Sequence, residues 1–224
     1  MINGGYVRRT LCAIAAAGLL AACSPGTEAG TTEDLGSVPS VAPVKHFGPD
    51  GFGTITVGVS EKDALAGGEL QVAPVSTVLG KNVYSFVGGP APDPARMAAD
   101  EELEKAVEEA DRNPGTSAQE AADDAQTYAD STVRIADRLI AFLDAGGAAF
   151  RDGSLEVVAA PKDATTAEGI KRGSTLAELQ AAYGSKGLTK SSDTAYTLAA
   201  AGHEGWTLLF ELEGDTIAYM SLGK

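Results

Sequence analysis

The middle of the chain carries a helical pattern that limits the possible folds more than any other segment does. From Ala118 to Leu143, apolar residues recur at three- and four-residue spacings, and Ser117 with Glu120 forms a capping box at the start. An acidic helical pattern over 92–112 precedes it and ends at Asn113-Pro114-Gly115. The two patterns predict an antiparallel helical hairpin over 92–145, with an apolar stripe of the second helix facing a partner surface.

Strand-like segments lie on both sides of this hairpin, beyond the glycine pairs Gly88-Gly89 and Gly146-Gly147 that bracket it. One strand is predicted at 83–87, and two more at 148–151 and 155–159 flank Asp152-Gly153, a β-hairpin turn signal. Further along, Thr175 and Glu178 form another capping box, and three strands are predicted at 195–199, 206–212 and 216–222. These patterns predict an α+β fold in which short helices pack on an antiparallel sheet.

Two segments with the same residue pattern predict an internal repeat. Residues 58–64 and 173–179 both read as glycine, a spacer, a hydroxyl residue, two further positions, an acid and an apolar residue. We therefore expect two weakly repeated units, formed by 46–91 with 146–169 and by 170–224. The helical hairpin at 92–145 is then an insertion in the first unit, and 162–168 is predicted to be a loop.

The start of the chain has the organisation of an export signal. Arg8-Arg9 precede an apolar run from Leu11 to Ala22 that is too short to span a bilayer as a stable helix. The run ends in Leu20-Ala21-Ala22-Cys23, which resembles the lipobox of bacterial lipoprotein precursors. The resemblance implies a signal peptide at 1–22, a lipid on Cys23, and anchoring to the extracytoplasmic face of the cell membrane.

Two alternatives stay open for this segment. One is an ordinary secretory signal in which the cysteine is incidental. The other is export by the twin-arginine route, because Arg8-Arg9 also resembles a twin-arginine export signal. After Cys23, the chain to residue 45 is rich in Ser, Thr, Gly, Pro and Glu and has no periodic apolar pattern. This composition predicts a flexible tether over 23–45 with a root-mean-square reach of roughly 25 Å.

Composition disfavours several functional classes. The formal net charge of −14 and the pI near 4.5 argue against binding to nucleic acid or to anionic head groups. Cys12 and Cys23 are the only cysteines, so the chain after residue 23 has no disulfide and no thiol nucleophile. No P-loop, GxSxG or dinucleotide-binding motif is present, and we expect no cofactor.

The residues that might carry catalysis or bind metal are few. His46 and His203, the only histidines, lie in segments predicted to be exposed loops, which disfavours a metal site or a catalytic triad. Glu101-Glu102 and Asp123-Asp124 are neighbours on helices, where their oxygens diverge, so a solvated face is favoured over a cation site. The remaining acids Glu156, Glu178 and Glu211 were candidates for an acid–base pair, but no such pair is favoured. We therefore predict no catalytic residue and no metal site.

One predicted strand offers a candidate partner surface. Its residues Trp206, Leu208, Phe210 and Leu212 share one face and are predicted to be core, with Ile217 and Tyr219 pairing with them across a turn at 213–215. The opposite face carries Thr207, Leu209 and Glu211. We expect these three residues to lie on an open sheet face that meets a partner.

The segment Gly173-Ser174-Thr175-Leu176-Ala177-Glu178-Leu179, together with Tyr183-Gly184, resembles exported proteins of the BamE and beta-lactamase-inhibitor-protein type and many actinobacterial lipoproteins. The resemblance implies a helix packed on a three- or four-stranded sheet, and a binding or assembly role rather than catalysis. This chain departs from the beta-lactamase inhibitors because it lacks their disulfides and has few aromatic residues in its sheet. Inhibition of a beta-lactamase is therefore not expected.

These observations favour a membrane-tethered, non-enzymatic lipoprotein that binds another envelope protein or a cell-wall component. The alternative is a lipid or small-ligand carrier that uses the helical hairpin as a lid over the sheet, and a hydrolase is a third class. A carrier requires a large apolar cavity, and a hydrolase requires a cleft that holds His46 or His203 beside an acid.

Overall fold

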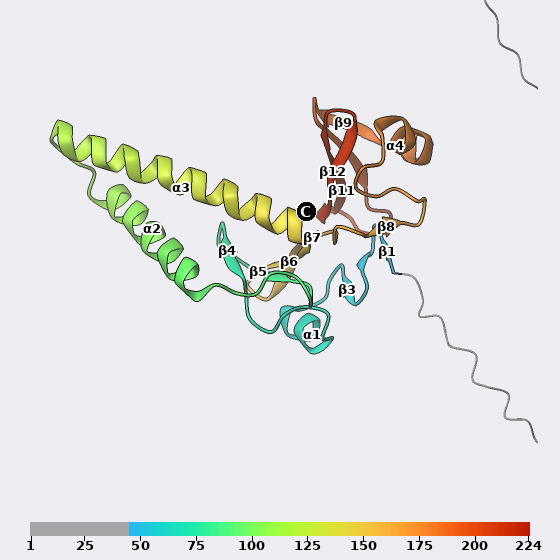
Figure 1. Ribbon diagram of the computed structural model, residues 1–224, viewed down its shortest axis with the longest axis horizontal. Coiled ribbons are helices and arrows are strands. Elements are labelled where there is room, and N and C mark those ends of the chain that lie inside the picture. The colour runs from blue at the N-terminus through green and yellow to red at the C-terminus, as the bar shows by residue number, and fades with distance from the viewer. Residues whose placement is uncertain (1–44) are drawn as a thin grey trace, which may run out of the picture. The chain divides into compact units, whose positions relative to one another are not determined.

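An antiparallel sheet of eight strands forms the centre of the domain (Figure 1). The computed structural model describes residues 45–224, so the predicted signal peptide, Cys23 and nearly all of the predicted tether lie outside the described residues. In chain order, the strands of the sheet are β4 Ser76–Val78, β5 Lys81–Ser85, β6 Gly147–Arg151, β7 Ser154–Ala159, β9 Thr189–Ser192, β10 Ala195–Ala199, β11 Thr207–Glu213 and β12 Thr216–Gly223. Their order across the sheet is β4-β5-β6-β7-β12-β11-β10-β9.

Four α-helices accompany the sheet within the described residues: α1 Glu61–Ala66, α2 Pro94–Arg112, α3 Ala118–Ala145 and α4 Leu176–Tyr183. Both predicted capping boxes are present at the starts of α3 and α4, since each N-cap hydroxyl and its glutamate exchange hydrogen bonds with the backbone. The prediction of an α+β fold with an antiparallel sheet is therefore confirmed. None of these helices between residues 45 and 224 has both the length and the apolar composition of a membrane span.

Some short strands form where the sequence pattern predicts none. The edge strand β9 contains only exposed residues, so it lacks the apolar alternation that marks a strand, and its pairing with β10 creates it. The predicted loop at 162–168 contains β8, Thr165–Thr166, which pairs in parallel with β1, His46–Phe47. In a separate two-stranded ribbon, β2, Gly51–Phe52, is likewise unpredicted, whereas its partner β3, Ile55–Thr56, lies within the strand that the sequence predicts at 54–57.

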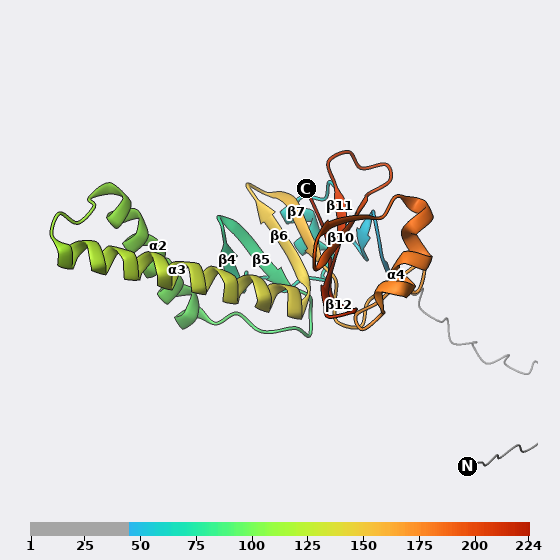
Figure 2. The same ribbon diagram turned by 90° about the horizontal axis from the view of Figure 1, so that it is seen from above.

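The helices α2 and α3 form an antiparallel hairpin that lies between β5 and β6 in the chain and projects beyond the sheet (Figure 2). The 28 residues of α3 make a helix about 42 Å long. Phe142, near its end, is buried, whereas Val133, Leu139 and Ile140 are 61%, 44% and 52% exposed. The expectation that the whole apolar stripe faces a partner surface is therefore wrong, because Leu139 and Ile140 are exposed even in the last two turns and only Arg138 and Phe142 of α3 are buried.

The helix α3 stops at the glycine pair that the sequence marks as its end. Gly146 has a φ of +74°, and a Cβ atom there would lie 2.8 Å from the backbone of Pro161. At Gly147, which opens β6, a Cβ atom would lie 2.1 Å from the carbonyl oxygen of Tyr84. Glycine at both positions lets the chain leave the helix and pair at once with β5.

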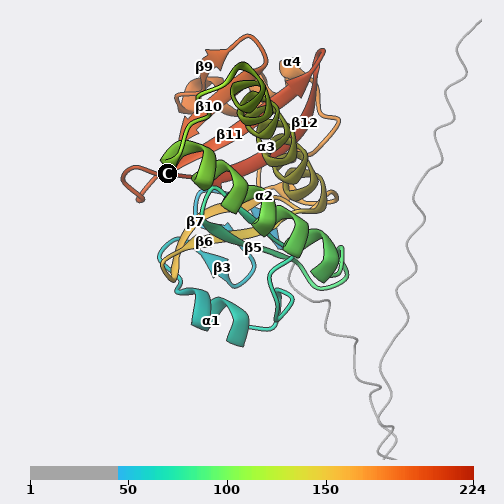
Figure 3. The same ribbon diagram turned by 90° about the vertical axis from the view of Figure 1, so that its left-hand side faces the viewer.

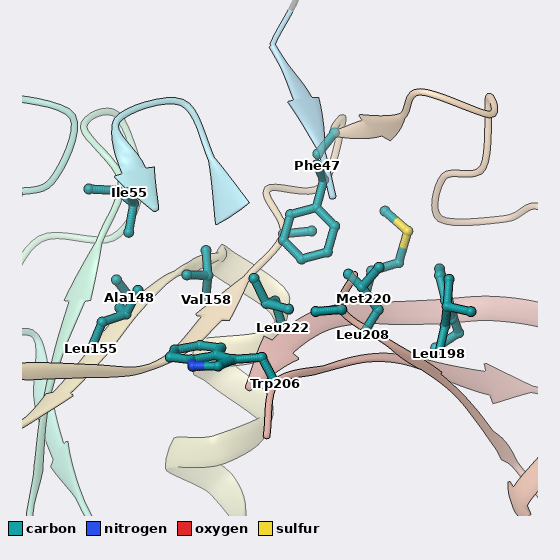
Figure 4. Packing of buried hydrophobic residues seen from close by; sticks show 14 of the residues in the cluster. Phe47, Ile55, Ala148, Leu155, Val158, Leu198, Trp206, Leu208, Met220 and Leu222 are labelled. Atoms are coloured by element: carbon teal, nitrogen blue, oxygen red, sulfur yellow. The ribbon is translucent and has the colours of Figure 1, made fainter. Parts of the chain in front are cut away.

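The main hydrophobic core lies on the face of the sheet that α1 and α4 cover, and it draws on both halves of the chain. Figure 4 shows Phe47 of β1 pointing toward Leu208, Met220 and Leu222 of the sheet. The core residues predicted for the strand at 206–212 are confirmed, since all four are buried: Trp206, which immediately precedes β11, and Leu208, Phe210 and Leu212 within it.

The predicted place of Tyr219 on this core face is wrong. A register shift between Glu211 and Leu212 makes Ile217 the partner of Leu212 and Tyr219 the partner of Glu211. An extra residue in one strand of a pair moves the following side chains to the other face. Ile217 is therefore buried in the core as expected, whereas Tyr219 lies beneath the guanidinium of Arg172 at 5.0 Å.

A smaller hydrophobic cluster forms on the opposite face of the sheet. Along β5 and β6, Tyr84 and Ala148 belong to the main core, whereas their neighbours Val83 and Ala149 belong to the second cluster, as strand alternation requires. Phe142 of α3 packs into this second cluster. In Figure 3 the hairpin points toward the viewer in front of the sheet, with α1 and α4 near opposite ends of it.

Candidate functional site

An apolar groove of about 210 Å³ lies between α3 and the second face of the sheet. Four side chains of α3 form one wall: Ile135, Leu139, Phe142 and Leu143. The other wall crosses six strands and the β4–β5 turn, and its residues are Val78, Leu79, Lys81, Val83, Ala149, Val157, Leu209, Glu211 and Ser221. Leu79 and Leu139 remain 61% and 44% exposed, so the groove opens onto apolar surface.

The register of the strands determines which side chains form the floor of the groove. Val83 is opposite Ala149, and Ala149 is opposite Val157, so the three side chains point to the same face from adjacent strands. Leu209 is opposite Ser221, which extends the same face to β12 and β11. The groove therefore depends on alternation within the strands and on their order in the sheet.

The three residues predicted to form a partner surface have different places here. Leu209 and Glu211 line the groove, whereas Thr207 does not, and all three are half-buried. The predicted open face is thus partly covered by the end of α3. Sequence reasoning missed the α3 wall, although the apolar spacing that includes Leu139 was the signal that pointed to it.

A single arginine holds the end of α3 in position beside the groove. Arg172 donates to the carbonyl oxygen of Leu143 and pairs with Asp144 at 3.3 Å between Nη1 and Oδ1. It also donates to the carbonyl oxygen of Ala160 at 3.4 Å. Because the last carbonyls of a helix lack intrahelical partners and carry partial negative charge, a cation at this end stabilises the helix.

Charge at the groove comes from a small ion-pair network and from the hairpin. Lys81, which lines the groove, pairs with Glu156 at 2.9 Å, and Arg151 pairs with the same carboxylate at 3.1 Å. The hydrogen bond from Lys81 lowers the pKa of Glu156, in line with its part in this ion-pair network. Between residues 92 and 145, fourteen acidic and five basic residues give the hairpin a net charge of −9.

The two histidines lie outside the groove. His203 Nε2 is 2.8 Å from Asp50 Oδ1, and this contact joins the β10–β11 loop to the turn between β1 and β2. The side chain of Asp50 is exposed, and His46 Nδ1 lies 3.3 Å from the carbonyl oxygen of Thr165. The structure thus brings one histidine beside an acid, and this pair lies on the surface.

The candidate acids on the helices make local contacts. Glu101 and Glu102 pair with Lys105, Asp123 accepts from Gln119, and Asp124 accepts from the N–H of Gly115. Hydrogen bonding from the backbone N–H of Thr175 lowers the pKa of Glu178, in line with its capping role. Within residues 45–224, no three His, Cys, Asp or Glu side chains are arranged as a metal-binding group.

Comparisons with protein-family models, with curated proteins and with solved structures find no match for this chain.

Proposed function

We propose that the protein is a membrane-tethered, non-enzymatic binding module of the cell envelope. Its docking site is the groove between α3 and the sheet, and its partner is a basic amphipathic segment of another envelope protein. The groove itself is the observation that carries this proposal, because it joins apolar walls to exposed apolar side chains at its rim. Exposed apolar surface rimmed by polar residues is typical of protein interaction sites.

The size of the groove favours a partner side chain over a lipid. Pockets that enclose small molecules commonly measure roughly 300–1,000 Å³. A groove of about 210 Å³ holds one or two aliphatic or aromatic side chains of a partner. The alternative function, a lipid or small-ligand carrier with the hairpin as its lid, requires the hairpin to move away from the sheet and enlarge this space.

Charge complementarity supports a basic partner. The hairpin beside the groove carries a net charge of −9 out of −14 for the whole chain, and Glu211 adds a carboxylate at the groove. Charges around an interface raise the rate of association with an oppositely charged partner and select against like-charged ones. A segment with apolar anchors and flanking Lys or Arg residues meets both requirements.

The membrane tether is the second part of the proposal. The basic pair, the apolar run and the lipobox before Cys23 occur in the order of a lipoprotein precursor. More than one acyl chain at the processed cysteine gives stable anchoring, unlike a single chain. The domain is therefore held at the extracytoplasmic face, where it meets envelope proteins and wall components.

We further propose that the sheet consists of two copies of one unit, 46–91 with 146–169 and 170–224, with 92–145 inserted in the first. In each unit the first residue of the short helix donates a hydrogen bond to a β-hairpin turn of the same unit. The N–H of Glu61 in α1 donates to the carbonyl oxygen of Gly153, and the N–H of Leu176 in α4 donates to that of Asp215, both at 2.9 Å. The last strands that the two units contribute to the eight-stranded sheet, β7 and β12, are neighbours. This symmetry supports a relationship to the BamE and beta-lactamase-inhibitor-protein type.

The test is crosslinking and capture of the full-length lipoprotein from its own membranes. Leu209→Asp places a charge in the groove and is expected to reduce recovery of the partner at least about tenfold. Val72→Asp is the matched control, since Val72 is 87% exposed and does not line the groove. Leu139→Asp repeats the test from the α3 wall, in case Leu209→Asp destabilises the sheet.

The captured partner must also have the expected chemistry. Its protected segment should contain Lys or Arg beside apolar residues, and recovery should fall as ionic strength rises. A partner that binds both groove variants as well as it binds wild type contradicts the proposed site. Recovery of an acyl lipid instead of a protein favours the carrier, and recovery of a glycan favours a wall component.

A further inference from the structure

A second cavity, of about 480 Å³, lies at the base of the hairpin on the other side of β4. Its walls are mostly apolar and come from the segment around β4 and from the start of α2: Ala73, Pro74, Thr77, Pro92, Pro94, Met97 and Ala98. Its charged residues are Asp100, Glu101, Glu104 and Arg138. The cavity thus combines apolar walls with three carboxylates and one guanidinium.

Asp100 is the unusual member of this set. It is 4% exposed, and neither of its carboxylate oxygens accepts a hydrogen bond from any residue that the structure describes. Its nearest cations are Arg134, with Nε at 3.4 Å from Oδ1, and Arg138, with Nε at 3.8 Å from Oδ2. A buried carboxylate without a hydrogen-bond donor costs free energy even when charges of opposite sign are near.

Two nitrogen atoms of Arg138 donate hydrogen bonds to groups other than Asp100. Its Nη1 donates to the carbonyl oxygen of Thr77 at 2.5 Å and to Glu104 at 3.0 Å, and its Nε donates to the carbonyl oxygen of Arg134 at 3.4 Å. Arg138 therefore fixes the hairpin to β4 and has no well-aligned hydrogen bond for Asp100. The side chain of Arg134, in contrast, is 41% exposed and can move into solvent.

We propose that this cavity binds an organic cation, an ammonium or guanidinium group on an aliphatic stem. The cationic group takes the place of Arg134 beside Asp100 and donates to the carboxylate, while the stem lies along Pro92, Pro94 and Met97. The source is either a free amine or a Lys or Arg side chain of a protein, since both present the same group. This site is separate from the groove under α3, so the two proposals stand or fall independently.

The composition of the cavity selects this class of ligand. Three carboxylates against one guanidinium leave a net charge of −2 among the lining residues, which repels anions. Proline, methionine and alanine walls offer no ligands to a hydrated metal ion but pack against methylene groups. Charge-assisted hydrogen bonds to a carboxylate are the strong ones, so Asp100 should dominate the affinity.

The test is calorimetric titration of the purified full chain with four probes. N-acetyl-arginine methylamide represents a protein side chain, agmatine represents a free amine, N-acetyl-citrulline methylamide is the uncharged isostere, and magnesium chloride represents a metal ion. We expect binding of one or both guanidinium compounds, at least about tenfold weaker binding of the citrulline compound, and no heat from magnesium. If N-acetyl-arginine methylamide binds more tightly than agmatine, the site prefers a protein side chain; if agmatine binds more tightly, it prefers a free amine.

Variants separate a ligand site from a merely structural ion pair. Asp100→Asn should weaken guanidinium binding at least about tenfold, whereas Arg134→Ala should strengthen it because the competing internal cation is gone. Ala98→Phe fills the cavity from an exposed helical position and should block binding without touching Asp100, which covers the case in which Asp100→Asn fails to fold. Glu109→Gln, far along α2 and paired with Arg112, is the control that should leave binding unchanged.

Three results would overturn the proposal. The first is absence of guanidinium binding by both wild type and Arg134→Ala. The second is unchanged binding by a folded Asp100→Asn or Ala98→Phe chain. The third is binding of magnesium alone, which would make the cavity a metal site.

Discussion

Phe210 and Leu209 are neighbours in β11 whose side chains point to opposite faces of the sheet. Phe210 is fully buried and contacts the ring of Tyr183 at a centroid distance of 5.5 Å, whereas Leu209 is half-buried at the groove. We expect Phe210→Ala to cost about 3–5 kcal/mol of unfolding free energy, and Leu209→Ala about 1 kcal/mol. Denaturant melts of the two variants measure both values.

The comparison between these two variants also tests how far α3 covers the sheet. If Leu209→Ala is as costly as Phe210→Ala, the second face is closed in solution and the hairpin acts as a cover. That result would weaken the binding-module proposal and strengthen the carrier. A Leu209→Ala cost well below that of Phe210→Ala leaves the groove open to a partner.

Cys23 carries the prediction about anchoring. Cleavage at the proposed lipobox would leave it as the only cysteine, so Cys23→Ala should abolish lipidation and move the protein to the aqueous phase in detergent phase partitioning. Cys12→Ala is the matched control, because Cys12 belongs to the predicted signal peptide. A Cys23→Ala protein that still enters the detergent phase with labelled acyl chains would refute the lipobox interpretation.

The helical hairpin is the element whose two ends have different roles. Its base carries Asp100, Glu104 and Arg138 and contributes Phe142 to the second hydrophobic cluster. Its outer part is held mainly by contacts between α2 and α3, such as the hydrogen bond from Tyr128 to Asp111 at 2.7 Å. The sequence alone indicates only that the hairpin, bracketed by its two glycine pairs, is an insertion in the first unit.

Two deletions distinguish the base of the hairpin from its tip. Replacing 106–130 by a short Gly-Ser loop should change the unfolding free energy of the sheet little, because the second cluster keeps all its members. Removing 90–145 and joining the glycine pairs should cost at least about 3 kcal/mol, since it exposes Val78, Val83 and Ala149 and removes Phe142. Equal stability of the two deletions would show that the base is as dispensable as the tip.

At the scale of the whole molecule, the two halves of the chain share one core. Phe47 and Ile55 from the first half lie in the same cluster as Phe210 and Leu222 from the second, and β7 pairs with β12. We therefore expect the slowest amides of β6 and of β11 to exchange with the same opening free energy, within about 1 kcal/mol. Hydrogen exchange measured by NMR tests this, and faster exchange throughout one half would show that the halves unfold separately.

Local features of the fold could be predicted from the sequence, whereas features that depend on long-range pairing could not. Capping boxes such as Ser117 with Glu120 were predicted correctly because their hydrogen bonds join residues three apart. The turn at Asp152-Gly153 was also predicted, and both residues have positive φ, at 50° and 76°. The strand β9 and the position of Tyr219 were not predicted, since neither the pairing of an edge strand nor a β-bulge can be recognised in the local residue pattern.

The sequence by itself determined the α+β class, the helix starts, the turns and the inward face of β11, because each depends on residue spacing along one element. Only the tertiary structure decided where the end of α3 contacts the sheet and that it covers the sheet face that carries Leu209. It also decided which charged side chains lie beside Asp100. Arg138 reaches Thr77 across 61 residues of chain. Contacts at such separations depend on strand order and helix length together, and no local pattern of residues specifies them.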